Sequence, residues 1–221
     1  MSYEEARQLQ ESLALQIAAG EIPPTLLLLE HPHTYTLGRR GQEKNLLWNS
    51  ETLQQRGVSV HWIDRGGDIT YHGPGQLVGY PLLPLGRPTV QSGTSHLPQA
   101  DYLGYLRLLE EMLILALAQF GVEGLQIEGK TGVWVQKDDR QEKLASIGIK
   151  VDAKGISRHG FALNVAPDIS YWQGIIACGL PGDQMTSLAA ILPSPPSLQQ
   201  VNMAVIAAFS ERFHYRMVKY P

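Results

Sequence analysis

The chain of 221 residues contains a single cysteine, Cys178. One thiol cannot form a disulfide within the chain, and it cannot build a cysteine-rich zinc site. Charge is also scarce, since 18% of the residues are charged and the formal net charge is −3 at pH 7. Without a basic excess that could follow a phosphate backbone, we do not expect a nucleic-acid partner.

Long hydrophobic runs are missing as well. The longest one lies in EMLILALAQF at residues 111–120, and it is too short to span a bilayer. Residues 1–16 combine acidic side chains with helical periodicity, which is not the pattern of a signal peptide. We therefore expect a cytoplasmic protein with no membrane partner.

Three common site motifs are absent. The glycine-rich stretch at 65–81 has no lysine and is followed by strand-like sequence, so it fits neither a phosphate-binding loop nor a dinucleotide-binding turn. His31 and His33 flank Pro32, but the chain has no HExxH and no acidic residues that would complete a ligand set. We therefore expect no metal site.

The stretch itself, RGGDITYHGPGQLVGYP, is the most informative feature present. Its five glycines alternate with polar and aromatic side chains. Glycine permits positive φ and a close approach of the backbone to another group. The pattern indicates a loop that lines a substrate site, and the competing interpretation is a tight hairpin with glycine bulges.

Periodicity and turn residues predict the fold class. Helical spacing favours helices over residues 3–19, 46–56, 101–120 and 198–215. The expected apolar face of the first helix carries Leu9, Leu13 and Ile17, and that of the third carries Leu103, Leu106, Leu109, Leu113 and Leu117. Short apolar runs separated by turn residues favour a meander of strands, and a regular strand–helix alternation is missing. We expect one α/β (α+β) domain over residues 1–221, with a mixed, largely antiparallel sheet, flanking helices and a mobile loop at 84–100.

Cys178 stands where an apolar run ends in a turn containing Gly179 and Pro181. An exposed thiol there could act as a nucleophile, but at a pKa near ~8.5 it needs a nearby base or cation. Lys143, at the start of the strand-like KLASIGIKV, is the candidate partner. The alternatives are a buried structural cysteine and a lysine that merely charges a strand edge.

Four segments in this order resemble one family. They are RGGDITYHGPGQLVGYP, KLASIGIKV, HGFALNVAPD and CGLPGDQMTSL, and LLLLEHPHTYTLGRR and TGVWV also match. The chain thus resembles the lipoyl(octanoyl) transferases, the lipoate-biosynthesis protein B family. The resemblance implies the fold of the biotin and lipoate protein ligase catalytic domains.

The resemblance also implies an activity. An octanoyl group would pass from acyl carrier protein, through a thioester on Cys178, to a lysine of lipoyl domains. The acceptors would be the lipoyl domains of 2-oxoacid dehydrogenase complexes and the glycine cleavage H protein. This is the first step of endogenous protein lipoylation. Thioester exchange is nearly balanced and amide formation runs downhill, so no cofactor, metal or ATP is expected.

The resemblance assigns residue roles by position in these motifs. Cys178 and Lys143 would form the catalytic dyad. The implied substrate contacts are Arg65, Gly66, Gly67, Asp68, Ile69, Thr70, Tyr71, His72, Ser146, Ile147, Gly148, Gly160, Phe161 and Ala162. One position departs from the family, because Ala177 replaces the usual proline before the cysteine, and alanine leaves the backbone less restricted there.

Two other functions fit parts of the pattern. An ATP-dependent lipoate or octanoate ligase would share the fold but needs no nucleophilic cysteine. A non-catalytic module that binds lipoyl domains or acyl carriers would need neither Cys178 nor Lys143, so the presence of both favours an enzyme.

Overall fold

The computed structural model describes residues 1–86, 101–177 and 184–219. Most of the loop predicted at 84–100 lies outside these residues, and so does Cys178. In the part of the chain that is described, no helix is both long enough and apolar enough to cross a membrane.

Two sheets form the framework. The larger has the order β1-β5-β9-β8-β7-β6, and a short β10 pairs with β8. Its strands are β1 (Thr25–Leu29), β5 (Gln76–Leu82), β6 (Leu125–Ile127), β7 (Lys130–Lys137), β8 (Arg140–Val151), β9 (Ser157–Asn164) and β10 (Gln184–Met185). All neighbours in it are antiparallel except β8 and β10.

The smaller sheet has β2 at its centre. This strand (Thr34–Leu37) is parallel to β3 (Ser59–Trp62) and antiparallel to β4 (Ile69–His72). Together the sheets confirm the predicted mixed, largely antiparallel architecture.

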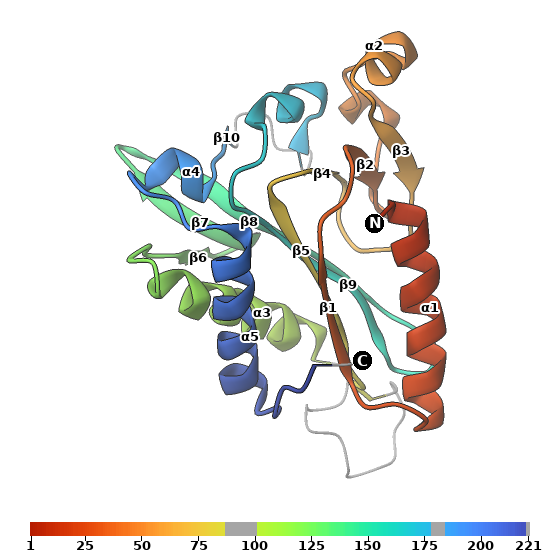
Figure 1. Cartoon of the computed structure of the whole chain (residues 1–221). Coiled ribbons are helices and arrows are strands. Elements are labelled where there is room, and N and C mark those ends of the chain that lie inside the picture. The colour runs from red at the N-terminus through yellow and green to blue at the C-terminus, as the bar shows by residue number, and fades with distance from the viewer. Residues whose placement is uncertain (87–100, 178–183, 220–221) are drawn as a thin grey trace.

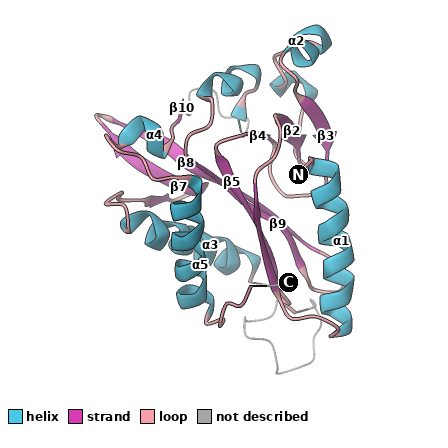
Figure 2. Ribbon diagram, in the orientation of Figure 1, coloured by secondary structure: helices cyan, strands magenta, loops and turns pink. Residues whose placement is uncertain are grey.

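Helices cover both faces of the larger sheet (Figures 1 and 2). On one face α3 (Tyr102–Ala118) and α5 (Leu198–Phe213) pack against each other, and α1 (Tyr3–Ala19) lies on the other. Shorter helical segments lie in the connections: η1 (Glu43–Asn45), α2 (Ser50–Gln55), η2 (Ile169–Gly174) and α4 (Leu188–Ile191).

Capping residues explain why the long helices begin where they do. Ser2 and Glu5 form a capping box on α1, Ser197 and Gln200 form another on α5, and Asp101 caps α3. Each cap satisfies backbone N–H groups that have no partner in the first turn. The sequence predicted these starts to within a few residues.

The buried face of α1 differs from the prediction. Leu9 and Leu13 are only half-buried, and the fully buried residues are Tyr3, Ala6, Gln10, Ala14 and Ile17. The small side chains of Ala6 and Ala14 let the helix approach the sheet closely.

The α3–α5 side holds the main apolar core. Leu109, Leu113 and Leu117 are fully buried on α3 and meet Val205 and Phe209 of α5. Leu103, also in the predicted apolar stripe, is 65% exposed because it lies at the start of the helix.

The glycine-rich stretch is not one loop. It contains β4 in the smaller sheet and most of β5 in the larger one, and a turn at residues 73–75 joins them. Gly75 has a φ of 84°, a left-handed conformation that favours glycine, and its carbonyl accepts from the N–H groups of Val165 and Ala166. The stretch therefore links the two sheets, and only residues 65–68 and 73–75 are loop or turn.

Candidate active site

A cavity of about 610 Å³ lies where the two sheets meet. Its wall contains every predicted substrate-binding residue except Tyr71. It also contains Lys143 and several residues that the sequence did not single out as contacts, namely Tyr3, Arg40, Gln42, Lys44, Asn45, Tyr80, Leu106, Gly129, Lys130, Thr131, Trp134, Ile149 and His159.

Small side chains on β8 and β9 make room for this cavity. Ser146 lies opposite Ala162 in the strand pairing, and Gly148 lies opposite Gly160. A Cβ atom at Gly148 would come within 3.0 Å of Cδ of Arg65. The loop at 65–67 thus lies directly on the strand, and the N–H of Gly66 donates to the carbonyl of Ile149 at 2.9 Å.

Arg65 and Asp68 hold the wall together. The buried guanidinium of Arg65 donates to the carbonyls of Thr36 at 2.6 Å and Gly66 at 2.9 Å. The Asp68 carboxylate accepts from the backbone N–H of Gln42 at 3.2 Å and from the side-chain amide of Asn45. These bonds tie the glycine motif to β2 and to η1.

One part of the wall consists of buried aromatic and imidazole rings. Nδ1 of His72 lies 2.9 Å from Oε1 of Gln76, and Nδ1 of His159 lies 3.4 Å from the hydroxyl of Tyr3. Burial lowers the pKa of His72 to about 3. Burial also lowers the pKa of His159, although Asp64 beside it acts in the opposite sense. At neutral pH, His72 is therefore uncharged.

Tyr71 is the predicted contact that the structure does not bring to the cavity. Thr70 and His72, its neighbours on β4, both line the cavity, and successive side chains of a strand point to opposite faces. The Tyr71 hydroxyl lies 2.8 Å from Nδ1 of His33, and its ring stacks on Tyr171 with centroids 5.3 Å apart. Tyr71 thus packs under η2.

Lys143 lies in an interior strand of the larger sheet and is only 4% exposed. The interpretation that it merely charges a strand edge is therefore wrong. Its Nζ lies 5.2 Å from the ring centroid of Trp134, the residue opposite it on β7. The burial places an amine on the wall of the cavity beside an aromatic ring.

Cys178 falls in the undescribed segment 178–183, but the residues on both sides of that segment are placed. Before it, the N–H of Ile176 donates to the carbonyl of the cavity residue Asn45 at 2.8 Å. After it, Met185 of β10 pairs with Lys143. Both ends of the segment therefore lie beside residues of the cavity wall.

Some of the lining residues that the sequence did not predict as contacts nevertheless lie in or beside the motifs quoted above. Trp134 lies in TGVWV, and His159 comes directly before Gly160 in the HGFALNVAPD motif. Tyr3 lies in none of these motifs, and it meets His159 only because α1 packs on the sheet.

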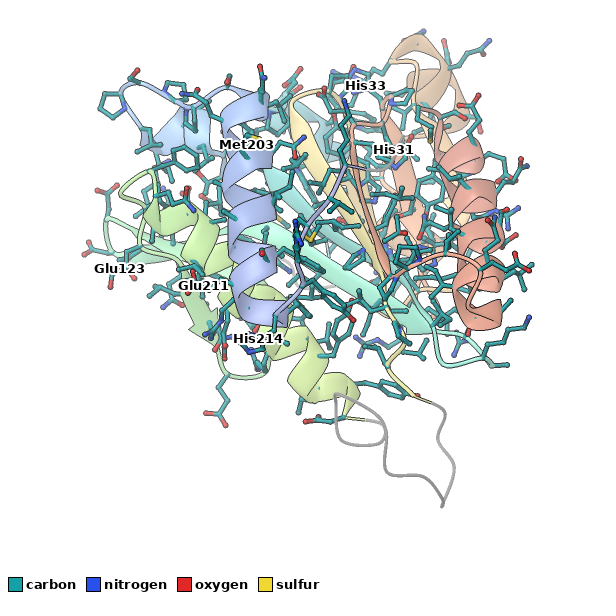
Figure 3. The ribbon with its side chains drawn as sticks, turned by 60° about the horizontal axis from the view of Figure 1, so that its bottom comes forward. His31, His33, Glu123, Met203, Glu211 and His214 are labelled. Carbon is teal, nitrogen blue, oxygen red and sulfur yellow. The ribbon has the colours of Figure 1, made fainter. Side chains whose placement is uncertain are left out.

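The histidines among the described residues form no metal site. His31 and His33 lie far from His214, which ends α5 (Figure 3). In residues 1–86, 101–177 and 184–219, no group of three histidine, cysteine or acidic side chains could hold a metal ion.

Comparison with known proteins identifies the family. The lipoyl protein ligase A/B catalytic domain family matches residues 2–210. An octanoyltransferase of Syntrophotalea carbinolica is 51% identical over 209 residues, which cover 95% of this chain and 89% of that protein. The chain belongs to the octanoyltransferase family. Its members are acyltransferases, and an octanoyltransferase of Chloroflexus aurantiacus is 42% identical over 96% of this chain and 90% of that protein.

Solved structures show the fold of this octanoyltransferase family member. A bipartite lipoate protein ligase of Thermoplasma acidophilum superposes with a TM-score of 0.70 over 96% of this chain and 82% of that chain, at 16% identity. The structure of a lipoate-protein ligase A bound with ATP superposes with a TM-score of 0.66 over 93% of this chain and 81% of that chain, at 18% identity. The predicted ligase-type catalytic fold is confirmed.

Proposed function

We propose that the chain transfers an octanoyl group from acyl carrier protein to a lysine of lipoyl domains through a thioester on Cys178. The observation that carries the proposal is the buried Lys143 on the wall of a cavity floored by small side chains. Such a cavity can hold an extended acyl chain, and the amine can exchange a proton with a thiol. Membership of the octanoyltransferase family supports the choice of acyl group.

The reaction has two steps. Lys143 takes the proton of the Cys178 thiol, and the thiolate attacks the carbonyl carbon of the octanoyl thioester. The bond to the carrier's sulfur breaks, and that sulfur leaves as a thiol with the proton from Lys143. The acceptor lysine amine then attacks the acyl-enzyme, an amide forms, and the Cys178 sulfur leaves and recovers a proton.

No ATP is consumed, because an amide is more stable than the thioester from which it forms. The cavity wall supplies binding for the acyl chain, and we place the implied contacts on the residues that line it. Tyr71 is excluded from this set because it lies on the other face of β4.

A basic surface beside the cavity suits an acidic acyl carrier. The sequence has two basic clusters, and one of them consists of Lys150, Lys154 and Arg158. In this cluster Lys154 is exposed, but Lys150 and Arg158 form ion pairs with Asp64. The other consists of Arg39, Arg40 and Lys44, all of them exposed, and the last two line the cavity. We therefore propose this second cluster as the docking site for the donor.

Acceptors would be the lipoyl domains of 2-oxoacid dehydrogenase complexes and the glycine cleavage H protein. We propose that the reaction takes place in the cytoplasm and that residues 1–221 form one catalytic domain.

Intact-mass analysis tests the proposal. After mixing with octanoyl-acyl carrier protein, the wild-type chain should gain one octanoyl group, and Cys178→Ala should gain none. Lys143→Ala should slow acylation by about 10²-fold, the usual scale for loss of a proton acceptor. Lys137→Ala, which removes a half-exposed lysine from β7, is the matched control and should acylate at the wild-type rate.

Three outcomes would contradict the proposal. An octanoyl adduct that persists in Cys178→Ala would exclude the thioester. Turnover with free octanoate and ATP, without any carrier, would instead establish a ligase. Binding of the carrier without acylation or transfer would indicate a non-catalytic module.

A further inference from the structure

Glu110 of α3 is a fully buried carboxylate that the proposed reaction does not use. Its Oε1 accepts from the backbone N–H of Gly132 at 2.8 Å, and its Oε2 accepts from the guanidinium of Arg107 at 2.6 Å. Removing a carboxylate from water is costly unless its oxygens are bonded. The other buried residues of α3 are apolar or aromatic, so a carboxylate among them needs a reason beyond packing.

The bonded residue, Gly132, lies against Lys143. Gly132 has a φ of 119°, a conformation that favours glycine. A Cβ atom there would come within 2.6 Å of Cε of Lys143 and 2.4 Å of the carbonyl oxygen of Ala145. The lysine side chain therefore rests directly on the bare backbone of Gly132.

Trp134 lies against the same lysine. It is opposite Lys143 in the strand pairing, and its ring centroid lies 5.2 Å from Nζ. The register between β7 and β8 shifts between Val133 and Trp134. The lysine is thus positioned by two β7 residues, Gly132 and Trp134, which we call the Lys143 support.

We propose that Glu110 is a positioning residue for Lys143. By holding the N–H of Gly132, it fixes the Lys143 support and with it the place of the amine on the cavity wall. The contact that connects Glu110 to Lys143 is its hydrogen bond with Gly132. The inference rests on the proposed function to the extent that Lys143 is the proton acceptor for Cys178.

The test uses three variants of the full chain. Glu110→Met keeps the length of the side chain but removes the strong acceptor. Glu110→Gln keeps an acceptor oxygen for the N–H of Gly132 and should therefore keep Lys143 in its wild-type position. Glu111→Gln is the matched control, since Glu111 is the next residue on α3 and forms a surface ion pair with Arg212.

Two measurements separate positioning from stability. The first is the rate at which a limiting pulse of acetic anhydride labels Lys143, read by peptide mass spectrometry. The second is the pH profile of Cys178 alkylation by iodoacetamide. In Glu110→Met we expect about tenfold faster labelling and an alkylation profile displaced toward that of Lys143→Ala. Glu110→Gln and Glu111→Gln should stay within about twofold of wild type.

Unchanged labelling and an unchanged alkylation profile in folded Glu110→Met would overturn the inference. Should that variant not fold, Gly132→Ala gives the same readouts, because its methyl group would displace Lys143 directly. If Lys143→Ala itself leaves the alkylation profile unchanged, the proton transfer of the proposed function fails. The labelling rate still tests the Lys143 support in that case.

Discussion

The two faces of the larger sheet have opposite character although the same strands build both. On the α3–α5 face, Ala145 of β8 and Leu163 of β9 lie opposite each other within a continuous apolar core, and neither lines the cavity. On the other face, Ser146 and Ala162 lie beside the cavity and beside buried imidazoles and tyrosines. The first face is filled by α3 and α5, although Ile147 and Phe161 also reach the cavity wall. Helix α1 packs on part of the second face, and small side chains leave another part open to the cavity. Successive side chains of a strand alternate between the two faces.

His159 interrupts that alternation. It has a φ of 57°, which is uncommon for a residue other than glycine, and its ring meets Tyr3 and Asp64 instead of the α3–α5 core. The carboxylate of Asp64 accepts a hydrogen bond from the imidazole and pairs with Lys150, and these contacts hold its pKa far below the usual range. The local backbone conformation thus places a polar ring on the cavity wall.

The largest effect should come from the filled face. Leu113→Ala removes a fully buried side chain of α3 and should lower the free energy of unfolding by about 3 kcal/mol. Urea denaturation measures this loss. Leu103→Ala, a change of the same chemistry at a 65% exposed site on the same helix, should cost well under about 1 kcal/mol. Similar losses in the two variants would show that the helix does not pack as described.

The open face should respond to acid. The pKa of His31 is lowered to about 4 and that of His72 to about 3, mainly by burial. The unfolded chain takes up protons below pH ~6.5 while these native imidazoles stay neutral, so stability falls as the pH drops. From pH 7.5 to 5.0 each should cost about 2 kcal/mol.

Urea denaturation at several pH values measures that loss, and His72→Gln should reduce it. His214→Asn changes an exposed histidine at the end of α5 and should leave the pH dependence as in the wild type. Equal pH dependence in His72→Gln and wild type would mean that His72 is not buried in its neutral form.

The smallest effect should be on acyl-chain selection. Ala162→Val adds two methyl groups on the cavity floor, so the relative kcat/KM for octanoyl over hexanoyl donors should fall about tenfold, or ~1.4 kcal/mol. Competition between the two donors measures the ratio. Ala116→Val makes the same change in the α3–α5 core and should reduce stability without altering the ratio. A ratio that shifts in both variants would contradict the separation of the two faces.

Local patterns predicted much of the framework. Apolar spacing predicted α1, α3 and α5, and turn residues predicted the meander of β7, β8 and β9. Contacts that depend on packing were not predictable in this way. Periodicity favoured Leu9 and Leu13 for the buried face of α1, but close approach to the sheet selected Ala6 and Ala14.

For the site, the sequence by itself determined the family and about half of the residues that line the cavity, because those residues lie in short contiguous motifs. The tertiary structure alone decided which face Tyr71 occupies, and it alone brought Tyr3 to His159 and Glu110 to Gly132. These contacts depend on strand register and on helices docking across many residues of chain. No local pattern encodes such long-range packing.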